Sequence, residues 1–336
     1  MDIRARHQRL TLTEPFEISR GSSDVQDVLI VEIEHDGVIG IGEGSPVDYH
    51  GETAEKMLAE AQRDVAALLG DDPYALEAIM RRLHSEGLMG GTRMAVDGAL
   101  HDWIGKRLGQ PTWRLLGLDP VSPATSYTIG IDSVDGTADK VRRAVGYKVL
   151  KVKVGAAADL ERLEVVRAGF DGAIRIDGNE GWDLAIAKAM TPDLIRLGIE
   201  FVEQPFPRSD NESYLAYRSL PQRLPVVLDE SCQEARDVPH CATIADGVNI
   251  KLAKTGGIRG AISLARTARA HGLSVMLGCM IESELGISQS AQIASLVDHV
   301  DLDGHLLISD GPYQGLGLVD GVVTVSSAPG LGVKAV

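Results

Sequence analysis

The sequence YKVLKVKVG, from Tyr147 to Gly155, has the apolar residues of a buried strand but carries two lysines near its end. Because side chains alternate between the two faces of a strand, Lys151 and Lys153 point to the same side. Buried parallel strands are usually rich in Val, Ile and Leu, so a pair of lysines requires a physical explanation. One explanation is an exposed edge strand, whose lysines discourage pairing with other chains.

The apolar strands that follow favour a different explanation, because each of them also ends in a charged residue. They read AIRID, IEFVE, PVVLD and GVNIK, and they end at Asp177, Glu203, Asp229 and Lys251. Successive charged residues lie about 22 to 26 residues apart, which is the length of one strand, one helix and two loops. In a (β/α) barrel the carboxyl ends of the strands meet at the mouth, where active sites are built. We therefore expect these residues and Lys153 to converge.

Three carboxylates between two lysines have the chemistry of a divalent-cation site. Carboxylate oxygens are preferred ligands of Mg²⁺. Any one of the acids is equally well explained as a cap of the helix that follows its strand. That explanation does not account for all three acids at matching strand ends. The sequence therefore predicts a metal site formed by Asp177, Glu203 and Asp229.

The alternation of apolar and helical segments in the second part of the chain predicts an α/β fold. Helical patterns such as 160–168, 184–197 and 257–270 separate the strand candidates. A doubly wound open sheet is the main rival, but polar groups at most strand ends favour a closed, modified TIM barrel. The strand candidates lie near residues 126–131, 148–154, 173–177, 199–203, 225–229, 247–251, 273–279 and 299–303.

The first part of the chain predicts a separate α+β domain. Two alternating segments flank the hairpin signal Asp36-Gly37, and helical periodicity runs from residue 52 to 108. The polar segment PFEISRGSSD, residues 15–24, is expected to be a mobile loop. The sequence GIGEG, residues 40–44, lacks the G-x-G-x-x-G spacing of a phosphate-binding loop.

The pattern divides the chain into three parts. We expect an α+β domain at residues 1–122, ending near the Pro-containing connector LDPVSPA, and a barrel at residues 123–304. The Gly-rich, alternating remainder, residues 305–336, is too short for another strand and helix, so it should return to pack on the first domain.

Composition excludes several classes of function. A net charge of −15 argues against nucleic acid or an anionic membrane as a partner. The cysteines, Cys232, Cys241 and Cys279, have no C-x-x-C spacing, so we expect free thiols in a reducing compartment. The first residues lack the apolar core of a signal peptide, and no run approaches the roughly 18 apolar residues of a membrane span. We expect a cytoplasmic protein.

The motifs along the chain have a family resemblance. They are KVKVG (151–155), DGNEGW (177–182), VEQPF (202–206), LDES (228–231), NIKLAKTGGI (249–258) and GCMIES (278–283). With these motifs in this order, the chain resembles the enolase superfamily, in its muconate-lactonizing subgroup, over nearly its whole length. A further motif, DLDG at 301–304, is similar to the D-x-D signature of the dipeptide epimerases. The resemblance implies a capping domain over a (β/α)7β barrel, one Mg²⁺ per subunit and a homo-oligomer.

The resemblance assigns roles that agree with the chemistry of the residues. It implies that Asp177, Glu203 and Asp229 bind Mg²⁺, which stabilises the enediolate formed when an α-proton is removed next to a carboxylate. Lys153 and Lys251 then exchange protons with opposite faces of the α-carbon. A free lysine is protonated at pH 7, so each base requires a lowered pKa, which nearby positive charge can provide.

Further residues are implied as substrate contacts. Lys151 is expected to act as the like charge beside Lys153 and to touch the substrate carboxylate. Asp301 and Asp303 are expected to hold the free ammonium group of a dipeptide; the alternative is a solvated acidic loop. Arg20 matches the position where Ala-Glu epimerases place an arginine for the glutamate side chain, although a lone arginine is usually just solvated.

Weaker candidates surround these residues. Thr128 and Cys279 are expected to contact substrate, and Lys254 to be a structural cation near the site. Glu282 and Glu284 add negative charge after the seventh strand, which would also suit a cationic substrate side chain.

The sequence therefore predicts a Mg²⁺-dependent isomerase that epimerises dipeptides by 1,1-proton transfer. The resemblance makes L-Ala-D/L-Glu the best single substrate and connects the activity with breakdown of murein peptides. N-acylamino acid racemase, o-succinylbenzoate synthase and muconate cycloisomerase are alternatives, but their substrates lack a free ammonium group. A non-catalytic barrel would be expected to have lost one of the five strand-end groups, and all five are present.

Overall fold

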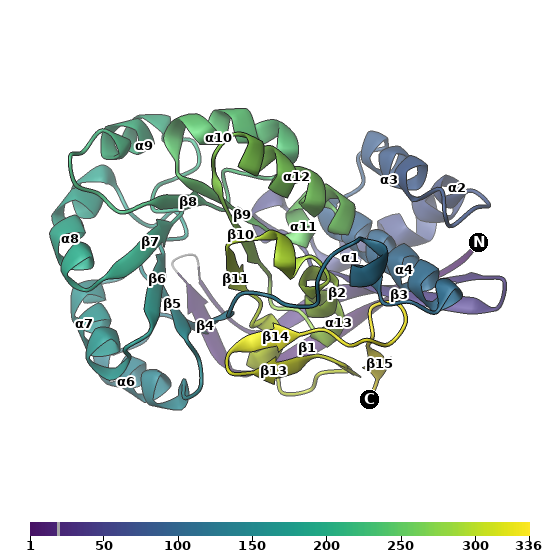
Figure 1. The fold of residues 1–336 in the computed structure, drawn as a ribbon, viewed down its shortest axis with the longest axis horizontal. Coiled ribbons are helices and arrows are strands. Elements are labelled where there is room, and N and C mark those ends of the chain that lie inside the picture. Colours follow the sequence, from purple (N-terminus) through teal and green to yellow (C-terminus); the bar gives the residue numbers. More distant parts are fainter. Residues whose placement is uncertain (19–20) are drawn as a thin grey trace.

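A barrel of parallel strands forms the larger part of the molecule (Figure 1). The computed structural model describes residues 1–18 and 21–336, and within them eight parallel strands follow one another in the sheet in sequence order. A bridge between Thr125 and Val300 joins the first strand to the last. The strands are β4 (Ser126–Ile129), β5 (Val149–Lys153), β6 (Ala173–Asp177), β7 (Ile199–Glu203), β8 (Val226–Leu228), β9 (Gly247–Ile250), β10 (Ser274–Gly278) and β11 (His299–Asp301). The predicted barrel is confirmed, because an open doubly wound sheet would not have this sequential order.

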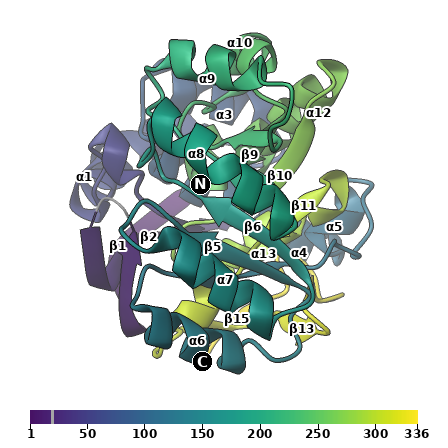
Figure 2. The same ribbon diagram turned by 90° about the vertical axis from the view of Figure 1, so that its left-hand side faces the viewer.

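Helices cover the outside of the barrel, and Figure 2 shows three of them, α6, α7 and α8, in front of the strands. Ser133, Asp183, Asp210 and Ser283 each cap a helix by accepting a hydrogen bond from a backbone N–H of its first turn. The last strand leads into a 3-10 turn, η5 (Gly304–Leu307), which gives the (β/α)7β pattern. The helices are α6 (Val134–Arg143), α7 (Asp159–Gly169), α8 (Leu184–Arg196), α9 (Asn211–Arg218), α10 (Val238–Ile244), α11 (Leu252–Thr255), α12 (Ile258–Ala270) and α13 (Glu284–Ala291).

The N-terminal domain packs an antiparallel sheet on helices. Strands β1 (Asp2–Ile18), β2 (Gly21–His35) and β3 (Val38–Gly44) are adjacent, and the predicted turn at Asp36 and Gly37 has positive φ at both residues. A Cβ atom on Gly42 would lie 2.1 Å from the carbonyl oxygen of Ala95. The glycines of GIGEG therefore allow close packing of β3 on α4. The helical elements are η1 (Asp48–His50), α1 (Ala54–Glu60), η2 (Ala61–Val65), α2 (Ala66–Leu69), α3 (Leu76–Ser85), α4 (Gly90–Leu108) and α5 (Thr112–Leu115).

In the segment expected to be a loop, the described residues, 15–18 of β1 and 21–24 of β2, are the paired ends of two antiparallel strands, the N-terminal hairpin. In its described part, Phe16 pairs with Ser23 and Ile18 with Gly21, after a shift of register that begins at Thr11. The prediction of a loop was wrong here because Pro, Gly and Ser hide the strand pattern, while backbone pairing with the partner strand supplies the stability. The backbone N–H of Ile131 donates to the Glu17 carbonyl oxygen at 3.1 Å, which attaches this hairpin to the barrel.

The C-terminal segment contacts the N-terminal domain. It pairs β12 (Tyr313–Gln314) with β15 (Lys334–Ala335) and β13 (Gly317–Val319) with β14 (Val322–Thr324). Arg6 donates to the Tyr313 hydroxyl at 2.8 Å, and the Leu331 N–H donates to Asp102 at 2.8 Å. We propose on this basis to divide the chain into a capping domain at 1–122, a barrel at 123–304 and a returning segment at 305–336. No helix in residues 1–18 and 21–336 combines the length and apolar character of a membrane span.

Candidate active site

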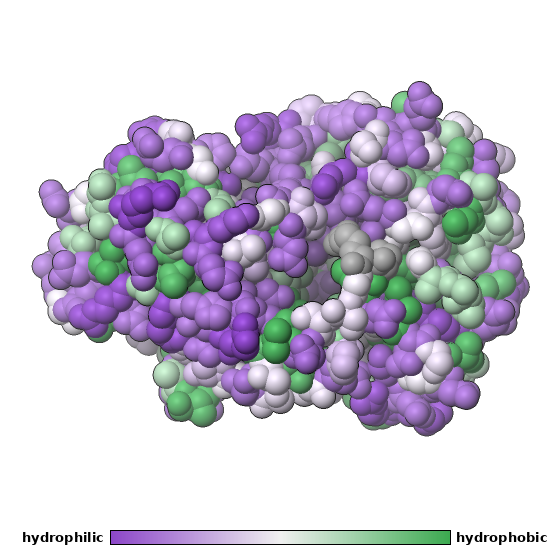
Figure 3. Space-filling view, turned by 180° about the vertical axis from the view of Figure 1, so that it is seen from behind, coloured by the Kyte–Doolittle hydropathy of each residue, from purple (hydrophilic) through white to green (hydrophobic). Residues whose placement is uncertain are grey.

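A cavity of about 520 Å³ lies at the carboxyl ends of the barrel strands, under the N-terminal hairpin. The space-filling view shows a hollow near the centre of one face, among mostly hydrophilic residues (Figure 3). The barrel contributes charged groups to the lining, whereas the capping domain contributes mainly apolar and neutral ones. Among the lining residues are Thr128, Lys151, Lys153, Lys251, Cys279, Asp301 and Asp303 from the barrel, and Phe16, Ile18, Gln26 and Tyr49 from the cap.

Lys153 and Lys251 lie on opposite sides of this cavity. Lys153 is the last residue of β5, and Lys251 follows β9 as the residue that precedes α11. The two strands are four positions apart in either direction around the eight-stranded sheet. The sequence prediction that the strand ends bring both lysines to one site agrees with this arrangement.

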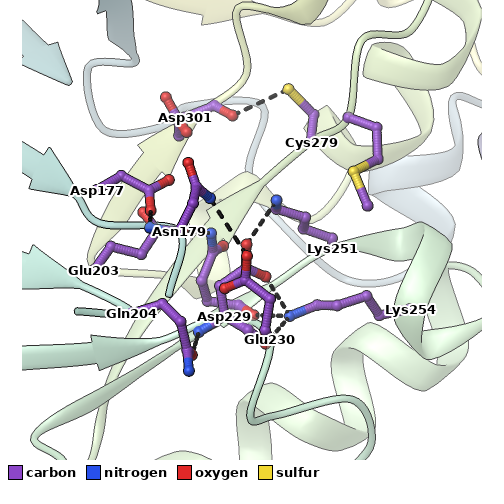
Figure 4. Close-up of polar contacts among 12 residues, drawn as sticks. Asp177, Asn179, Glu203, Gln204, Asp229, Glu230, Lys251, Lys254, Cys279 and Asp301 are labelled. Carbon is purple, nitrogen blue, oxygen red and sulfur yellow. Dashed lines mark hydrogen bonds and ion pairs between the residues drawn. The ribbon is translucent and has the colours of Figure 1, made fainter. Parts of the chain in front are cut away.

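The three predicted metal ligands come from the strands between those of the two lysines, and Figure 4 shows them together with Lys251. Asp177 and Glu203 end β6 and β7, Asp229 follows β8, and all three are fully buried. Each faces an ammonium group. Lys153 Nζ lies 2.6 Å from Asp177 Oδ2, and Lys251 Nζ lies 2.7 Å from Asp229 Oδ2. A buried carboxylate requires a partner of opposite charge, because an unpaired buried charge strongly destabilises the folded state.

The carboxylates fit a Mg²⁺ ion by their chemistry. Glu203 Oε2 and Asp229 Oδ2 are buried, and each has an ammonium nitrogen at 2.7 Å, that of Lys151 and that of Lys251. Burial raises the pKa of Asp229, but Lys251 and Lys254 outweigh it and lower that pKa, so the group is an anion. Hard oxygen donors with free lone pairs are what Mg²⁺ requires. A cation here would compete with the ammonium groups for the same oxygens.

A second acidic cluster lies on the capping domain. Among the described residues, His7, Asp27 and Glu55 form the one group of three potential ligands whose ligand atoms all lie within 4.8 Å of one another. Arg9 donates to both oxygens of Asp27, at 2.8 and 2.9 Å. Because that arginine already neutralises the carboxylate and the cluster is partly exposed, we consider it a surface ion-pair network.

Lys151 has partners that the sequence did not suggest. Its Nζ lies 3.0 Å from Asp177 Oδ2, 2.7 Å from Glu203 Oε2 and 2.9 Å from Asp301 Oδ2. Burial lowers the pKa of Lys151, but these carboxylates raise it by a larger amount. The pKa of Lys151 therefore lies well above its ordinary value. Lys151 is therefore a permanent cation that joins the predicted metal ligands to the predicted ammonium-binding pair.

Lys251 differs from the expectation of a lowered pKa. Burial lowers its pKa, but the Asp229 carboxylate raises it more, and the net effect is a rise. Lys251 is consequently an ammonium group when Asp229 is its partner. Its neutral form requires that other positive charge compensate the carboxylate.

Asp301 and Asp303 lie together with the two weaker candidates. The N–H of Thr128 donates to Asp303 Oδ2 at 2.6 Å, and the Cys279 thiol donates to the Asp301 carbonyl oxygen at 3.2 Å. Asp301 Oδ1 is buried and accepts no hydrogen bond from the described residues. Burial and the Asp301 charge raise the pKa of Asp303 to about 7. The remaining candidate for substrate contact, Arg20, lies outside the described residues.

Some residues at the site were missed or interpreted only loosely. Lys254 Nζ contacts Asp229 Oδ1 at 2.6 Å and donates to the carbonyl oxygens of Cys232 and Asn249, each at 2.9 Å, in agreement with a structural cation. Tyr49 lines the cavity from η1 and was missed. Its surroundings, VDYHG, contain no periodic or charge pattern that would single it out.

Glu282 and Glu284 do not form a receptor for a cationic side chain. Glu284 Oε2 accepts the N–H groups of Gly315 and Leu316, at 2.7 and 2.9 Å, so it holds the C-terminal segment. Glu282 is 1% exposed and lies behind the cavity, close to Glu43 of β3. The two glutamates therefore do not supply the pocket for a cationic side chain that the sequence allowed, because both carboxylates are used inside the fold.

Comparisons with known proteins agree with the geometry. The family model for the mandelate racemase / muconate lactonizing enzyme N-terminal domain matches residues 1–117, and the enolase C-terminal domain-like model matches residues 135–335. L-Ala-D/L-Glu epimerase of Bacteroides thetaiotaomicron is 38% identical over 331 residues, covering 97% of this chain and 86% of that relative.

Two solved structures are similar over the whole chain. The substrate-liganded L-Ala-D/L-Glu epimerase from Bacillus subtilis has a TM-score of 0.93 at 28% identity and covers 100% of this chain and 98% of its own. Dipeptide epimerase from Methylococcus capsulatus, in complex with Mg and L-Arg-D-Lys, has a TM-score of 0.92 at 34% identity, with 99% and 98% coverage. The chain belongs to the mandelate racemase and muconate lactonizing enzyme group of the enolase superfamily. Within that group it is a dipeptide epimerase, an isomerase.

The buried acid pair behind the cavity predicts an unusual pH dependence of stability. Burial raises the pKa of Glu282 from 4.5 to about 8, and burial also raises that of Glu43 to about 7. An acid with a raised pKa binds more protons in the folded state, so the wild type loses stability as the pH rises from about 4.5 to about 8. We predict that Glu282→Gln is within about 1 kcal/mol of the wild type at pH 5 and is more stable at pH 9, by about 5 kcal/mol at most.

Urea unfolding at pH 5 and pH 9 measures this difference. The matched control is Glu161→Gln, which changes an exposed residue of α7 and should unfold like the wild type at both pH values. Equal stability of Glu282→Gln and the wild type at pH 9 would show that the Glu282 carboxyl is not held in its neutral form.

Proposed function

We propose that the enzyme epimerises dipeptides of the L-Ala-D/L-Glu class by moving a proton at the α-carbon of the C-terminal residue, with Mg²⁺ as cofactor. One observation carries the proposal: Lys153 and Lys251 face each other across a cavity that has carboxylates on both remaining arcs. Two proton-transfer groups on opposite sides of one α-carbon are what inversion of configuration requires.

The two arcs give the substrate a direction. The ligand arc, formed by Asp177, Glu203 and Asp229, would hold the cation and with it the C-terminal carboxylate. The opposite arc, with Asp301 of β11 and Asp303 just after it, would receive the N-terminal ammonium group. A dipeptide laid between the arcs has the α-carbon of its second residue between the lysines.

Asp177, Glu203 and Asp229 are supported as Mg²⁺ ligands by their burial and by the convergence of three carboxylates on one arc, where ammonium groups hold them as anions. When bound, Mg²⁺ supplies positive charge that stabilises the second negative charge developing on the substrate carboxylate as the α-proton leaves. Lys153 and Lys251 do the proton work: one amine accepts the α-proton, and the other ammonium group delivers a proton to the opposite face. The roles reverse in the reverse reaction.

Asp301 supplies a free acceptor for the substrate ammonium group. One of its oxygens is held by Lys151, whereas Oδ1 is buried and has no hydrogen bond from the described residues. An incoming ammonium group would satisfy it and would add the positive charge that the acidic pair requires. The preference for a free dipeptide over an N-acylated amino acid follows from this pairing.

An acidic side chain on the second residue would require a cation on the capping domain. In the described part of the cavity lining, the cationic side chains are Lys151, Lys153 and Lys251, all of which have other roles. We assign recognition of the acid to Arg20, on its match to the family's arginine position and on the 38% identical L-Ala-D/L-Glu epimerase.

The test of this proposal is proton NMR in D₂O with Mg²⁺ and L-Ala-L-Glu, L-Ala-L-Leu and L-Ala-L-Lys. We predict loss of the α-proton signal of the second residue, growth of the epimer signal, and the fastest reaction for L-Ala-L-Glu. Arg20→Met should lower kcat/KM for L-Ala-L-Glu by about 10- to 100-fold, because a hydrogen bond to a charged group is lost. L-Ala-L-Leu serves as the control substrate. A preference for leucine or lysine would overturn the acidic class, and no exchange with any dipeptide would overturn the whole proposal.

A second prediction concerns the ammonium group. Asp301→Asn with Asp303→Asn should lower kcat/KM for L-Ala-L-Glu by about 30-fold or more, because the substrate's buried charge loses its partner. The measurement compares this substrate with N-acetyl-L-Ala-L-Glu, which has no ammonium group. Asp303→Asn alone leaves the ion pair between Lys151 and Asp301 in place and should have a smaller effect. An equal loss for the free and acetylated dipeptides would contradict the assignment.

A further inference from the structure

Arg162 is a buried arginine of α7 that contacts the backbone beside Lys153. Its side chain is 1% exposed. Nη1 donates to the Lys153 carbonyl oxygen at 3.0 Å, and Nη2 donates to the Gly130 carbonyl oxygen at 3.1 Å. Nε donates to the Thr137 hydroxyl at 3.2 Å. The rigid fork of a guanidinium group fixes the relative positions of such acceptors.

The guanidinium group lies where the backbone pairing of two strands stops. Strands β4 and β5 pair in register up to Ile129 and Val152. The next residues in register would be Gly130 and Lys153, and Arg162 contacts both of their carbonyl oxygens. The arginine therefore replaces the next rung of the sheet. It thereby supplies a donor to the carbonyl of the buried residue that carries the reactive amine, a group that requires a hydrogen-bond partner.

A second contact fixes the chain just after Lys153. Arg162 Nη1 also donates to Asp159 Oδ1 at 3.3 Å. The other carboxylate oxygen of Asp159 accepts the N–H of Gly155 at 2.8 Å and that of Ala156 at 3.3 Å. The Arg162–Asp159 pair thus holds the backbone at Lys153 itself and two residues later, so the position of the lysine stem is defined from both sides.

The opposite lysine has no share in this arrangement. These hydrogen bonds of Arg162 go to residues between Gly130 and Asp159, which belong to the β4 and β5 side of the barrel. Lys251 lies four strands away. Any loosening caused by loss of Arg162 should therefore affect one proton transfer more than the other.

We propose that Arg162 is a positioning residue for Lys153 and acts on one of the two proton transfers. This inference rests on the proposed function, in which Lys153 and Lys251 serve opposite faces of the α-carbon. Arg162 also holds Gly130, and the N–H of the next residue, Ile131, donates to the Glu17 carbonyl oxygen of the hairpin. Substitution of Arg162 should therefore also weaken the binding of both substrate epimers to the same degree.

The test measures α-proton exchange in D₂O with Mg²⁺, separately for L-Ala-L-Glu and L-Ala-D-Glu. Lys153→Met and Lys251→Met, each expected to retain exchange of one epimer, identify the epimer that Lys153 serves. In Arg162→Met, kcat for exchange of that epimer should fall by about tenfold more than kcat for the other, because small displacements of a reacting group are costly. KM should rise equally for both epimers.

Arg167→Met is the matched control, since Arg167 lies on the same helix and donates to the carbonyl oxygens of Phe170 and Gly172, remote from Lys153. It should leave the ratio of the two exchange rates at the wild-type value. Arg162→Lys keeps the positive charge but lacks the planar guanidinium group, and it replaces Arg162→Met if that variant does not fold. It should change the ratio of the two exchange rates in the same direction.

The outcomes separate the inference from the proposed function. If the wild type exchanges neither epimer, or if the two lysine variants do not separate the epimers, the proposed function fails and the inference fails with it. If the lysine variants separate the epimers but both Arg162 variants keep the wild-type ratio, Arg162 has only a structural role and the inference alone is overturned.

Discussion

The structure depends on keeping acidic and cationic side chains together inside the mouth of a barrel. Asp177, Glu203 and Asp229 are fully buried, and an unpaired buried carboxylate is strongly destabilising. The two lysines of β5, Lys251 just after β9 and Lys254 of α11 face them within 3.0 Å. The ion pairs that stabilise the buried carboxylates also prepare the site for chemistry, because each ammonium group lies beside a carboxylate that would bind a divalent cation.

The strand order of the barrel provides the geometry of this pairing. Sequential parallel strands bring residues about 25 positions apart in the chain to one ring, and a separation of four strands puts two lysines on opposite sides of it. The capping domain then closes the ring from above. Its hairpin contributes Phe16 and Ile18 to the cavity and is attached to the barrel through Glu17 and Ile131. Excluding water in this way strengthens every charge interaction in the cavity.

Much of this arrangement is readable in the sequence, because it follows from short-range rules. The period of 2 in a strand and the repeat of strand and helix fix which residues meet at the barrel mouth, so the strands and the convergence of Lys153 and Lys251 could be predicted. The paired strand ends at residues 15–18 and 21–24 could not be predicted, since their Gly, Ser and Pro residues conceal a strand pattern that pairing with another segment stabilises.

Other features depend on three-dimensional neighbours and leave no pattern in the sequence. Arg162 follows Asp159 by three positions, which on a helix suggests an ordinary surface ion pair, yet both are buried against the barrel. Glu282 and Glu284 suggest a negative pocket, but one lies behind the cavity and the other binds the C-terminal backbone. Lys151 joins three carboxylates from three strands, a relation that only the closed barrel creates.

The central claim is that the buried carboxylates, and not another acidic cluster, form the cation site. Anomalous diffraction from crystals soaked in Mn²⁺, a substitute for Mg²⁺ with the same preference for oxygen ligands, tests it most directly. The account predicts one strong peak in contact with Asp177, Glu203 and Asp229, which Glu203→Gln should weaken or abolish. Manganese found at His7, Asp27 and Glu55, with none among the three barrel carboxylates, would contradict it.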